Sequence, residues 1–220
     1  MERRFDEELK QLKERLFTMA SLAEQAVGKA VKALVDRDAV LAQDVINEDA
    51  VINRLEVEIE ETCLSLLARF QPEATDLRFI AMVFKIVNDL ERVGDQAVNI
   101  SERTRDLLKE PLLKPLIDIP NMAQLAQRML KDALDAFVAQ DAELARSVCR
   151  HDDQVDRLND QVYQELLGYM AKDPQTIGRA LDLILIGRHL ERVADHATNI
   201  AEDVYYLVRG STIKHRLAGI

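Results

Sequence analysis

Hydrophobic residues recur along most of the chain at alternating steps of three and four, the spacing that places side chains on one side of an α-helix. An N-terminal stripe keeps a 3.5-residue period and becomes all alanine in its later part, so a neighbouring helix can approach it closely there. No segment alternates with the period of two expected of a strand. The pattern predicts an all-α fold. The stripe residues are Leu9, Leu12, Leu16, Met19, Ala23, Ala26, Ala30 and Ala33.

Capping residues and prolines divide this pattern into six helices. The first is expected to start near Asp6, and Asp36 or Asp38 to cap a second helix that ends near Ala68, before Gln71-Pro72. Asp141 is expected to cap the fifth helix, and Asp173-Pro174 to begin the sixth, which ends at Gly210. The remaining expected helices span residues 75–109, 122–140 and 142–172.

Three prolines, Pro111, Pro115 and Pro120, separate the chain into two halves of three helices each. Three helices with short connections pack as an up-down-up bundle. We therefore predict a three-helix bundle over residues 1–110, a second one over 121–210, and a C-terminal tail over 211–220, with the bundles related by pseudo-two-fold symmetry. Pattern alone leaves open a single core shared by all six helices.

One stretch of polar and apolar residues occurs twice. The third helix of the first half carries Asp-Leu-Glu-Arg-Val-Gly-Asp-Gln-Ala-Val-Asn-Ile, residues 89–100. The last helix carries His-Leu-Glu-Arg-Val-Ala-Asp-His-Ala-Thr-Asn-Ile, residues 189–200. An internal repeat of this kind indicates that the chain is one three-helix unit written twice.

The repeated polar residues lie on one side of the helix, away from its apolar stripe, at about 100° per residue. A side that only contacts water is the ordinary interpretation of such a set. Exposed substitutions, however, cost within about 0.5 kcal/mol, so a solvated surface is free to drift between two copies. Because these polar residues return in register, we infer that a constraint other than folding preserves them. They are Glu91, Asp95, Asn99 and Glu102, and Glu191, Asp195, Asn199 and Glu202.

The helix before each repeat carries a second group of polar residues beside its own stripe. Asp49, Asn53 and Glu56 form this group in the first half, and the second half has Asp152, Asp156 and Asn159. These residues can reach the repeated helix across a packing edge. The sequence leaves open whether they are cation ligands or members of flanking salt bridges.

Charge and cysteine content narrow the range of partners. The net charge of −10 disfavours nucleic acid and anionic membranes, which need a basic surface, and favours metal cations or basic proteins. Cys63 and Cys149 stand alone on helical patterns, as small buried residues of a reducing compartment do. No apolar run spans a bilayer and no signal peptide follows Met1, so we expect a cytoplasmic protein.

Carboxylates at positions i and i+4 of a helix stand about 5–6 Å apart at Cβ, close enough to bind one cation or to bridge two. Oxygen ligands without sulfur suit iron, manganese, magnesium or calcium. His151, His189 and His196 have no counterparts in the first half, which has Glu48, Asp89 and Gln96 there, so histidine is an optional ligand.

A carboxylate-bridged metalloenzyme is the weaker alternative. Such helical enzymes use Glu-x-x-His pairs that point into the core. The repeated motif has no such pair, and its acids point away from the stripe. We find no nucleophilic triad and no phosphate-cradling Gly-rich loop.

The duplicated Glu-Arg-Val-Gly/Ala-Asp-x-Ala-x-Asn-Ile motif, on the third helix of each half, resembles the PhoU phosphate-regulation family over essentially the full chain. The resemblance implies two three-helix bundles with multinuclear iron or zinc clusters on their surfaces. It also implies a non-catalytic cytoplasmic regulator that connects the ATPase subunit of the high-affinity phosphate transporter to a sensor histidine kinase. Such a regulator keeps the phosphate-starvation response off when phosphate is plentiful.

Carried onto this sequence, the family motif gives two predicted sets of metal ligands. Asn53 stands where the second half has Asp156, so the first site is expected to hold fewer ions. Arg92 and Arg192 are expected to pair with neighbouring carboxylates or to face a partner. A metal-free scaffold whose acidic sides dock basic proteins is the main alternative, and we expect a homodimer, although the residues alone leave monomer and dimer open. The predicted ligands are Glu91, Asp95, Asn99 and Asp49 in the first half, and Glu191, Asp195, Asn199, Asp152 and Asp156 in the second.

Overall fold

The computed structural model describes residues 2–211 and residue 213, and in these residues it consists of helices and connections with no strand. The all-α prediction is confirmed. The expected tail over 211–220 falls largely outside the described residues. Of the described part, Ile213 is buried against the core. The helices are α1 (Glu2–Asp36), α2 (Ala39–Phe70), α3 (Ala74–Leu107), α4 (Asp118–Ala139), α5 (Ala142–Lys172), the 3₁₀ turn η1 (Pro174–Thr176) and α6 (Ile177–Arg209).

The helices begin and end where local chemistry dictates. Asp38 and Asp141 accept hydrogen bonds from the backbone amides of the second and third residues of α2 and α5, and each follows a residue with positive φ, Arg37 or Gln140. α1 begins at Glu2, four residues before the expected Asp6. α4 begins at Asp118, four residues before the expected start, because Pro120 lies in its first turn, where a missing N–H costs nothing.

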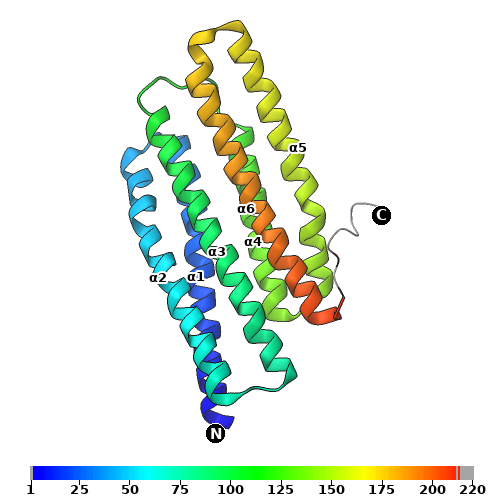
Figure 1. Cartoon of the computed structure of the whole chain (residues 1–220). Helices are drawn as coiled ribbons and strands as arrows, with labels where there is room; N and C mark the ends of the chain where they lie inside the picture. Colours follow the sequence, from blue (N-terminus) through cyan, green and yellow to red (C-terminus); the bar gives the residue numbers. More distant parts are fainter. Residues whose placement is uncertain (1, 212, 214–220) are drawn as a thin grey trace.

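The six helices run side by side as two three-helix units (Figure 1). The α2–α3 connection lies at one end of the molecule and the α5–α6 connection at the other, as a pseudo-two-fold relation requires. Within the described residues, α2 packs only on α1 and α3, and α5 packs on α4, α6 and η1. The halves meet where α3 packs on α6 and α1 on α4.

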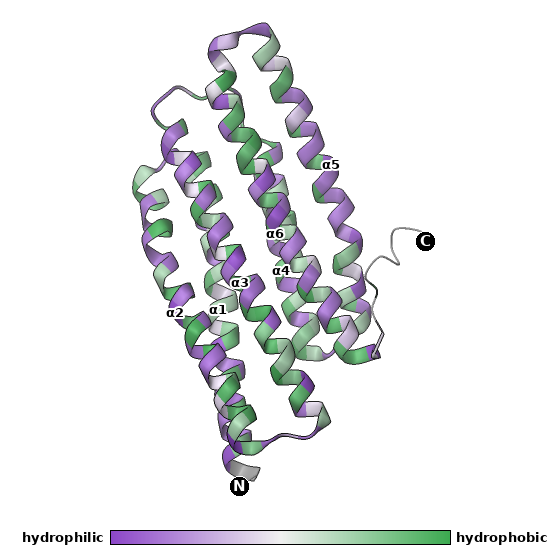
Figure 2. Ribbon diagram, in the orientation of Figure 1, coloured by the Kyte–Doolittle hydropathy of each residue, from purple (hydrophilic) through white to green (hydrophobic). Residues whose placement is uncertain are grey.

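The apolar stripes of all six helices face one another. Figure 2 shows hydrophilic and hydrophobic residues alternating in short blocks along each helix, as one-sided helices require. The buried side chains form one continuous cluster through both halves, from Leu16 in α1 to Leu190 in α6. The tandem bundles and the shared core therefore coexist. No helix in the described part of the chain is both long and apolar enough to cross a membrane.

The α3–α6 contact carries a polar layer that reproduces the two-fold relation. Asp89 Oδ1 lies 2.9 Å from His196 Nδ1, and Gln96 Oε1 lies 2.9 Å from His189 Nδ1. Positions 89 and 189 are equivalent in the repeat, as are positions 96 and 196. Asp89 therefore pairs with the equivalent of Gln96, and Gln96 pairs with the equivalent of Asp89. The two motif histidines therefore hydrogen-bond across the interface between the halves.

The linker fixes the two halves to each other through charged side chains. Lys114 is buried and pairs with Glu165 on α5 and, at 3.5 Å, with Asp118. Arg179 at the start of α6 donates to the carbonyl of Pro111 at 3.0 Å. Arg37 donates to the Leu108 carbonyl at 3.1 Å, where α3 ends.

Candidate functional site

Two clusters of acids lie where α2 meets α3 and where α5 meets α6. We call them the first and the second acidic face. The first comprises Asp49, Asn53, Glu56, Glu91 and Asp95. The second comprises Asp152, Asp156, Asn159, Glu191 and Asp195.

The first face brings the predicted acids of α2 and α3 together. Burial raises the pKa of Glu91, and the charges of Asp95, Glu56 and Asp49 raise it further. The pKa of Asp49 is also raised, by burial and then by Asp95, against a lowering hydrogen bond that Asn53 donates at 2.8 Å. These shifts mean that acids from two helices repel one another across the α2–α3 contact.

Buried oxygens without donors are the second feature of this face. Asp49 Oδ1 and Glu91 Oε2 are buried and accept no hydrogen bond, although Glu91 Oε2 lies 3.4 Å from Arg92 Nε. Arg92 also reaches Asp95 Oδ2 at 3.1 Å, as the sequence suggested. Unsatisfied buried oxygens are costly, and a bound cation would satisfy them.

Gly94 lets Asp49 approach α3. A Cβ at this position would lie 3.1 Å from Asp49 Oδ1 and 3.2 Å from a methyl group of Ile52, tighter than ordinary contact. The second repeat has Ala194 here, and its glycine is Gly187, where a Cβ would lie 2.7 Å from Asn159 Oδ1. Each face therefore has one glycine at its helix crossing, but at different positions.

The second face also gathers acids from two helices. Burial raises the pKa of Asp152 to about 6, with further contributions from Asp156 and Asp195. The pKa of Asp156 is raised by burial and then by Asp195. Glu191 instead forms an ion pair with Arg188, a partner that the sequence did not predict. The amide of Asn159 also donates a hydrogen bond to Glu191 at 2.6 Å.

The supporting asparagines and histidines are placed less uniformly. Asn199 donates to Asp89 Oδ1 at 3.4 Å, so its amide is turned toward the α3–α6 contact. Asn99 is half-buried on α3. Burial, and then the nearby Arg192, lowers the pKa of His189.

Glu56 is a member of the first face that the predicted ligand set omitted. The signal was present in the sequence, because Glu56 and Asn159 are equivalent, as are Asn53 and Asp156. An acid and an amide exchange places between the halves, so each face keeps four acids. The loss of charge inferred from Asn53 alone is therefore offset within its own face.

The faces fit a cation by their chemistry rather than by preformed coordination. Hard oxygen donors and mutual repulsion favour a divalent ion at both faces, and the first face adds buried oxygens that accept no hydrogen bond. Within the described residues, no three His, Cys, Asp or Glu side chains are arranged to hold a metal ion as they stand. Binding would therefore require carboxylates to turn toward a shared ion.

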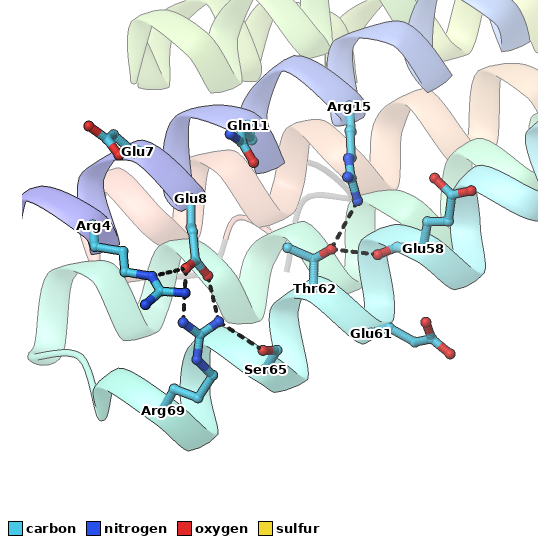
Figure 3. Close-up of a pocket in the computed structure, with 10 residues that line it drawn as sticks. All are labelled: Arg4, Glu7, Glu8, Gln11, Arg15, Glu58, Glu61, Thr62, Ser65 and Arg69. Atoms are coloured by element: carbon cyan, nitrogen blue, oxygen red, sulfur yellow. Dashed lines mark hydrogen bonds and ion pairs between the residues drawn. The ribbon is translucent and has the colours of Figure 1, made fainter.

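A large groove lies elsewhere, between the start of α1 and the end of α2 (Figure 3). It has a volume of about 650 Å³, and none of the motif acids lines it. Arg69 and Arg4 converge on Glu8 in this groove, with Arg69 Nη1 2.8 Å from Glu8 Oε2. These charges neutralise one another, which is the arrangement of a structural ion-pair network.

The cysteines are buried and unpaired. Burial raises the pKa of both Cys63 and Cys149 to about 12, so neither is a reactive thiolate.

Comparison with known proteins supplies a family for this geometry. The family model of the PhoU domain matches the chain twice, over residues 16–104 and 119–204. The chain is 45% identical to the phosphate-specific transport system accessory protein PhoU homolog of Aquifex aeolicus, over 95% of each protein. It is 32% identical to the Escherichia coli phosphate-specific transport system accessory protein PhoU, over 96% of this chain and 88% of that protein.

Solved structures agree with these matches. The crystal structure of PhoU from Pseudomonas aeruginosa superposes with a TM-score of 0.91 at 44% identity, over 94% of this chain and 100% of that one. The regulatory protein PhoU of the phosphate transport system from Streptococcus pneumoniae gives a TM-score of 0.87 at 34% identity, over 94% and 98%. Two tandem matches and two full-length superpositions confirm the duplicated three-helix architecture.

Proposed function

The chain belongs to the PhoU family, and from this premise we propose that it is a cytoplasmic negative regulator of the phosphate-starvation response. It acts as an adaptor between the ATPase subunit of a high-affinity phosphate ABC transporter and a membrane sensor histidine kinase. The observation that carries the proposal is the full-length match to proteins named as accessory to phosphate-specific transport. The proposal assigns no catalytic activity to the chain.

Deletion of the gene in its host tests the regulatory role. We expect a phosphate-starvation promoter reporter to become active in phosphate-rich medium, and the wild-type gene to silence it again. Tagged chain should co-purify with the transporter ATPase subunit and with the sensor kinase. A reporter that stays silent in the deletion strain would refute negative regulation.

We further propose that the two acidic faces bind transition-metal ions, iron first and zinc or manganese as alternatives, in multinuclear sites. The support is the mutual repulsion of acids from neighbouring helices at both faces and, at the first face, two buried carboxylate oxygens that accept no hydrogen bond. A bound ion supplies positive charge that offsets this repulsion. The chain's own contribution is to hold acids of two helices at one crossing, where an ion links the helices.

Metal content by mass spectrometry on untagged protein tests this part of the proposal. Wild type is expected to hold more than one transition-metal ion per chain. The Glu91→Ala/Asp95→Ala variant should lose the metal ions bound at the first face. The Glu191→Ala/Asp195→Ala variant should lose those bound at the second. Protein that is metal-free and cannot be loaded with iron, manganese or zinc would instead support the metal-free docking scaffold.

The same proposal includes a homodimer. Size-exclusion chromatography with light scattering should give twice the mass of the chain. A mass equal to one chain at micromolar concentration would remove this element and leave the adaptor role standing.

A further inference from the structure

We propose that the two acidic faces bind cations through different carboxylates: the first face uses Glu91, whereas the second uses Asp152, Asp156 and Asp195 and leaves Glu191 out. The inference rests on the proposed metal binding. It departs from the repeat, in which Glu91 and Glu191 are equivalent.

Both oxygens of Glu191 already have donors. Arg188 Nη1 lies 2.6 Å from Oε1 and 2.7 Å from Oε2, and Asn159 Nδ2 donates to Oε2 at 2.6 Å. The donors come from α6 itself and from the neighbouring α5. A cation at Glu191 would have to displace the guanidinium and the amide together, and charge-assisted hydrogen bonds of this kind are the strong ones.

Glu91 is equally buried but lacks these partners. Each of the two glutamate side chains is 16% exposed, so burial does not distinguish them. Where the second half has Arg188 and Asn159, the first has Asn88 and Glu56. Glu91 therefore faces an acid in place of the amide, and its Oε2 is buried without a hydrogen bond, with Arg92 Nε 3.4 Å away as its ion-pair partner.

The exchange of acid and amide gives the second face an additional carboxylate at Asp156, where the first face has Asn53. Asn53 donates to Asp49 in the first half, but its counterpart Asp156 is an acid close enough to Asp152 for their charges to interact. Asp195 lies within the same range of both. These three acids repel one another, whereas Glu191 is paired with Arg188 and Asn159.

Equilibrium dialysis of the full chain against Mn²⁺, with metal counted by mass spectrometry, tests the inference one face at a time. The first face is silenced with Glu91→Gln/Asp95→Asn, and then Glu191→Gln or Asp156→Asn is added. The second face is silenced with Asp152→Asn/Asp156→Asn, and then Glu91→Gln is added. Asp44→Asn, on the exposed side of α2, controls for the loss of one negative charge.

With the first face silenced, Asp156→Asn should weaken Mn²⁺ binding by about tenfold or more, because ligand charge count sets the affinity of oxygen sites. Glu191→Gln should change the Mn²⁺ affinity no more than Asp44→Asn does. With the second face silenced, Glu91→Gln should weaken binding about as much as Asp156→Asn does. Circular dichroism and thermal midpoints verify that each variant is folded.

Arg188→Asn/Asn159→Glu gives Glu191 the neighbours that Glu91 has in the first face, Asn88 and Glu56, and makes the converse test. In this variant the effect of Glu191→Gln on Mn²⁺ affinity should rise to about tenfold. If Glu191→Gln weakens Mn²⁺ binding as much as Asp156→Asn does in a chain that keeps Arg188 and Asn159, the inference is overturned. The proposed metal binding then remains intact. Wild type that binds no Mn²⁺ at either face would overturn both.

Discussion

Asp152 shows how a charged residue of the second face affects stability. Its pKa is about 6 in the folded chain, against 3.8 for an unperturbed aspartate, so between these values the folded state binds more protons than the unfolded state. Stability therefore falls as the pH rises through this window, the opposite of a salt-bridged aspartate. Above pH 6 the folded protein carries the cost of a partly buried charge.

We predict that Asp152→Asn stabilises the metal-free protein by about 1–2 kcal/mol at pH 7.5, after allowance for solvent screening of a side chain that is not fully buried. At pH 4 the gain should largely vanish, because the wild-type carboxyl is then protonated in the folded state. Urea unfolding in the presence of a chelator, at both pH values, measures the difference. An equal gain in stability at both pH values would show that the effect does not come from the charge of Asp152.

The caps of α2 and α5 are single-residue features: the sequence identified Asp141 outright and left Asp36 and Asp38 open, of which the structure selects Asp38. Asp38 and Asp141 each accept two backbone hydrogen bonds, whereas Glu73, at the same position before α3, accepts none. We predict that Asp38→Ala and Asp141→Ala each cost about 1 kcal/mol. Glu73→Ala, the matched control, should leave the urea midpoint unchanged, and a comparable loss there would contradict the capping argument.

Among the elements, the α2–α3 crossing depends on a residue without a side chain. Gly94→Leu would place atoms where Asp49 and Ile52 already lie, and overpacking of this kind costs about 1–3 kcal/mol. A Cβ at Gly168 on α5 would meet nothing within 4 Å, so Gly168→Leu should stabilise by about 0.5–1 kcal/mol through helix propensity. Denaturant unfolding should show a lower free energy of unfolding for Gly94→Leu and a higher one for Gly168→Leu. A loss of stability in both variants would refute the steric explanation.

The α3–α6 contact is the other element pair whose polar groups matter. Asp89→Ala leaves His196 without its partner inside the interface and should cost about 1–3 kcal/mol. Lys85 pairs with Asp203 on the same two helices, but its side chain is 59% exposed. Lys85→Ala should therefore cost less than about 1 kcal/mol. Thermal and urea unfolding would contradict this ranking if the two losses were equal.

At the scale of the whole molecule, the continuous core predicts that both halves unfold together. All four tyrosines, Tyr163, Tyr169, Tyr205 and Tyr206, lie in the second half, and the chain has no tryptophan. Tyrosine fluorescence therefore reports on the second half, and far-UV circular dichroism on all six helices. We expect the two urea transitions to coincide, as in a two-state unfolding. Separate midpoints would show that each half is stable alone.

The sequence by itself determined the succession of helices, the capping residues Asp141 and Asp173, the duplication and the family, because these depend on spacing and local chemistry within one helix. It placed the starts of α1 and α4 four residues too late, and in α4 the reason is a proline that is tolerated in the first turn. It also placed the acids correctly on one side of each motif helix, but it could not identify their partners. Helical periodicity gives the direction of a side chain and carries no information about the helix opposite.

Only the tertiary structure decided which polar groups meet. The packing of α3 on α6 pairs His196 with Asp89, residues 107 positions apart, because the pseudo-two-fold relation brings unlike positions of the repeat together. The packing of α5 on α6 pairs Asn159 with Glu191, whereas the same crossing in the first half sets Glu56 near Glu91. Two copies of one motif thus acquire different electrostatic surroundings, because each carboxylate's environment is set by the neighbouring helix that the fold places against it.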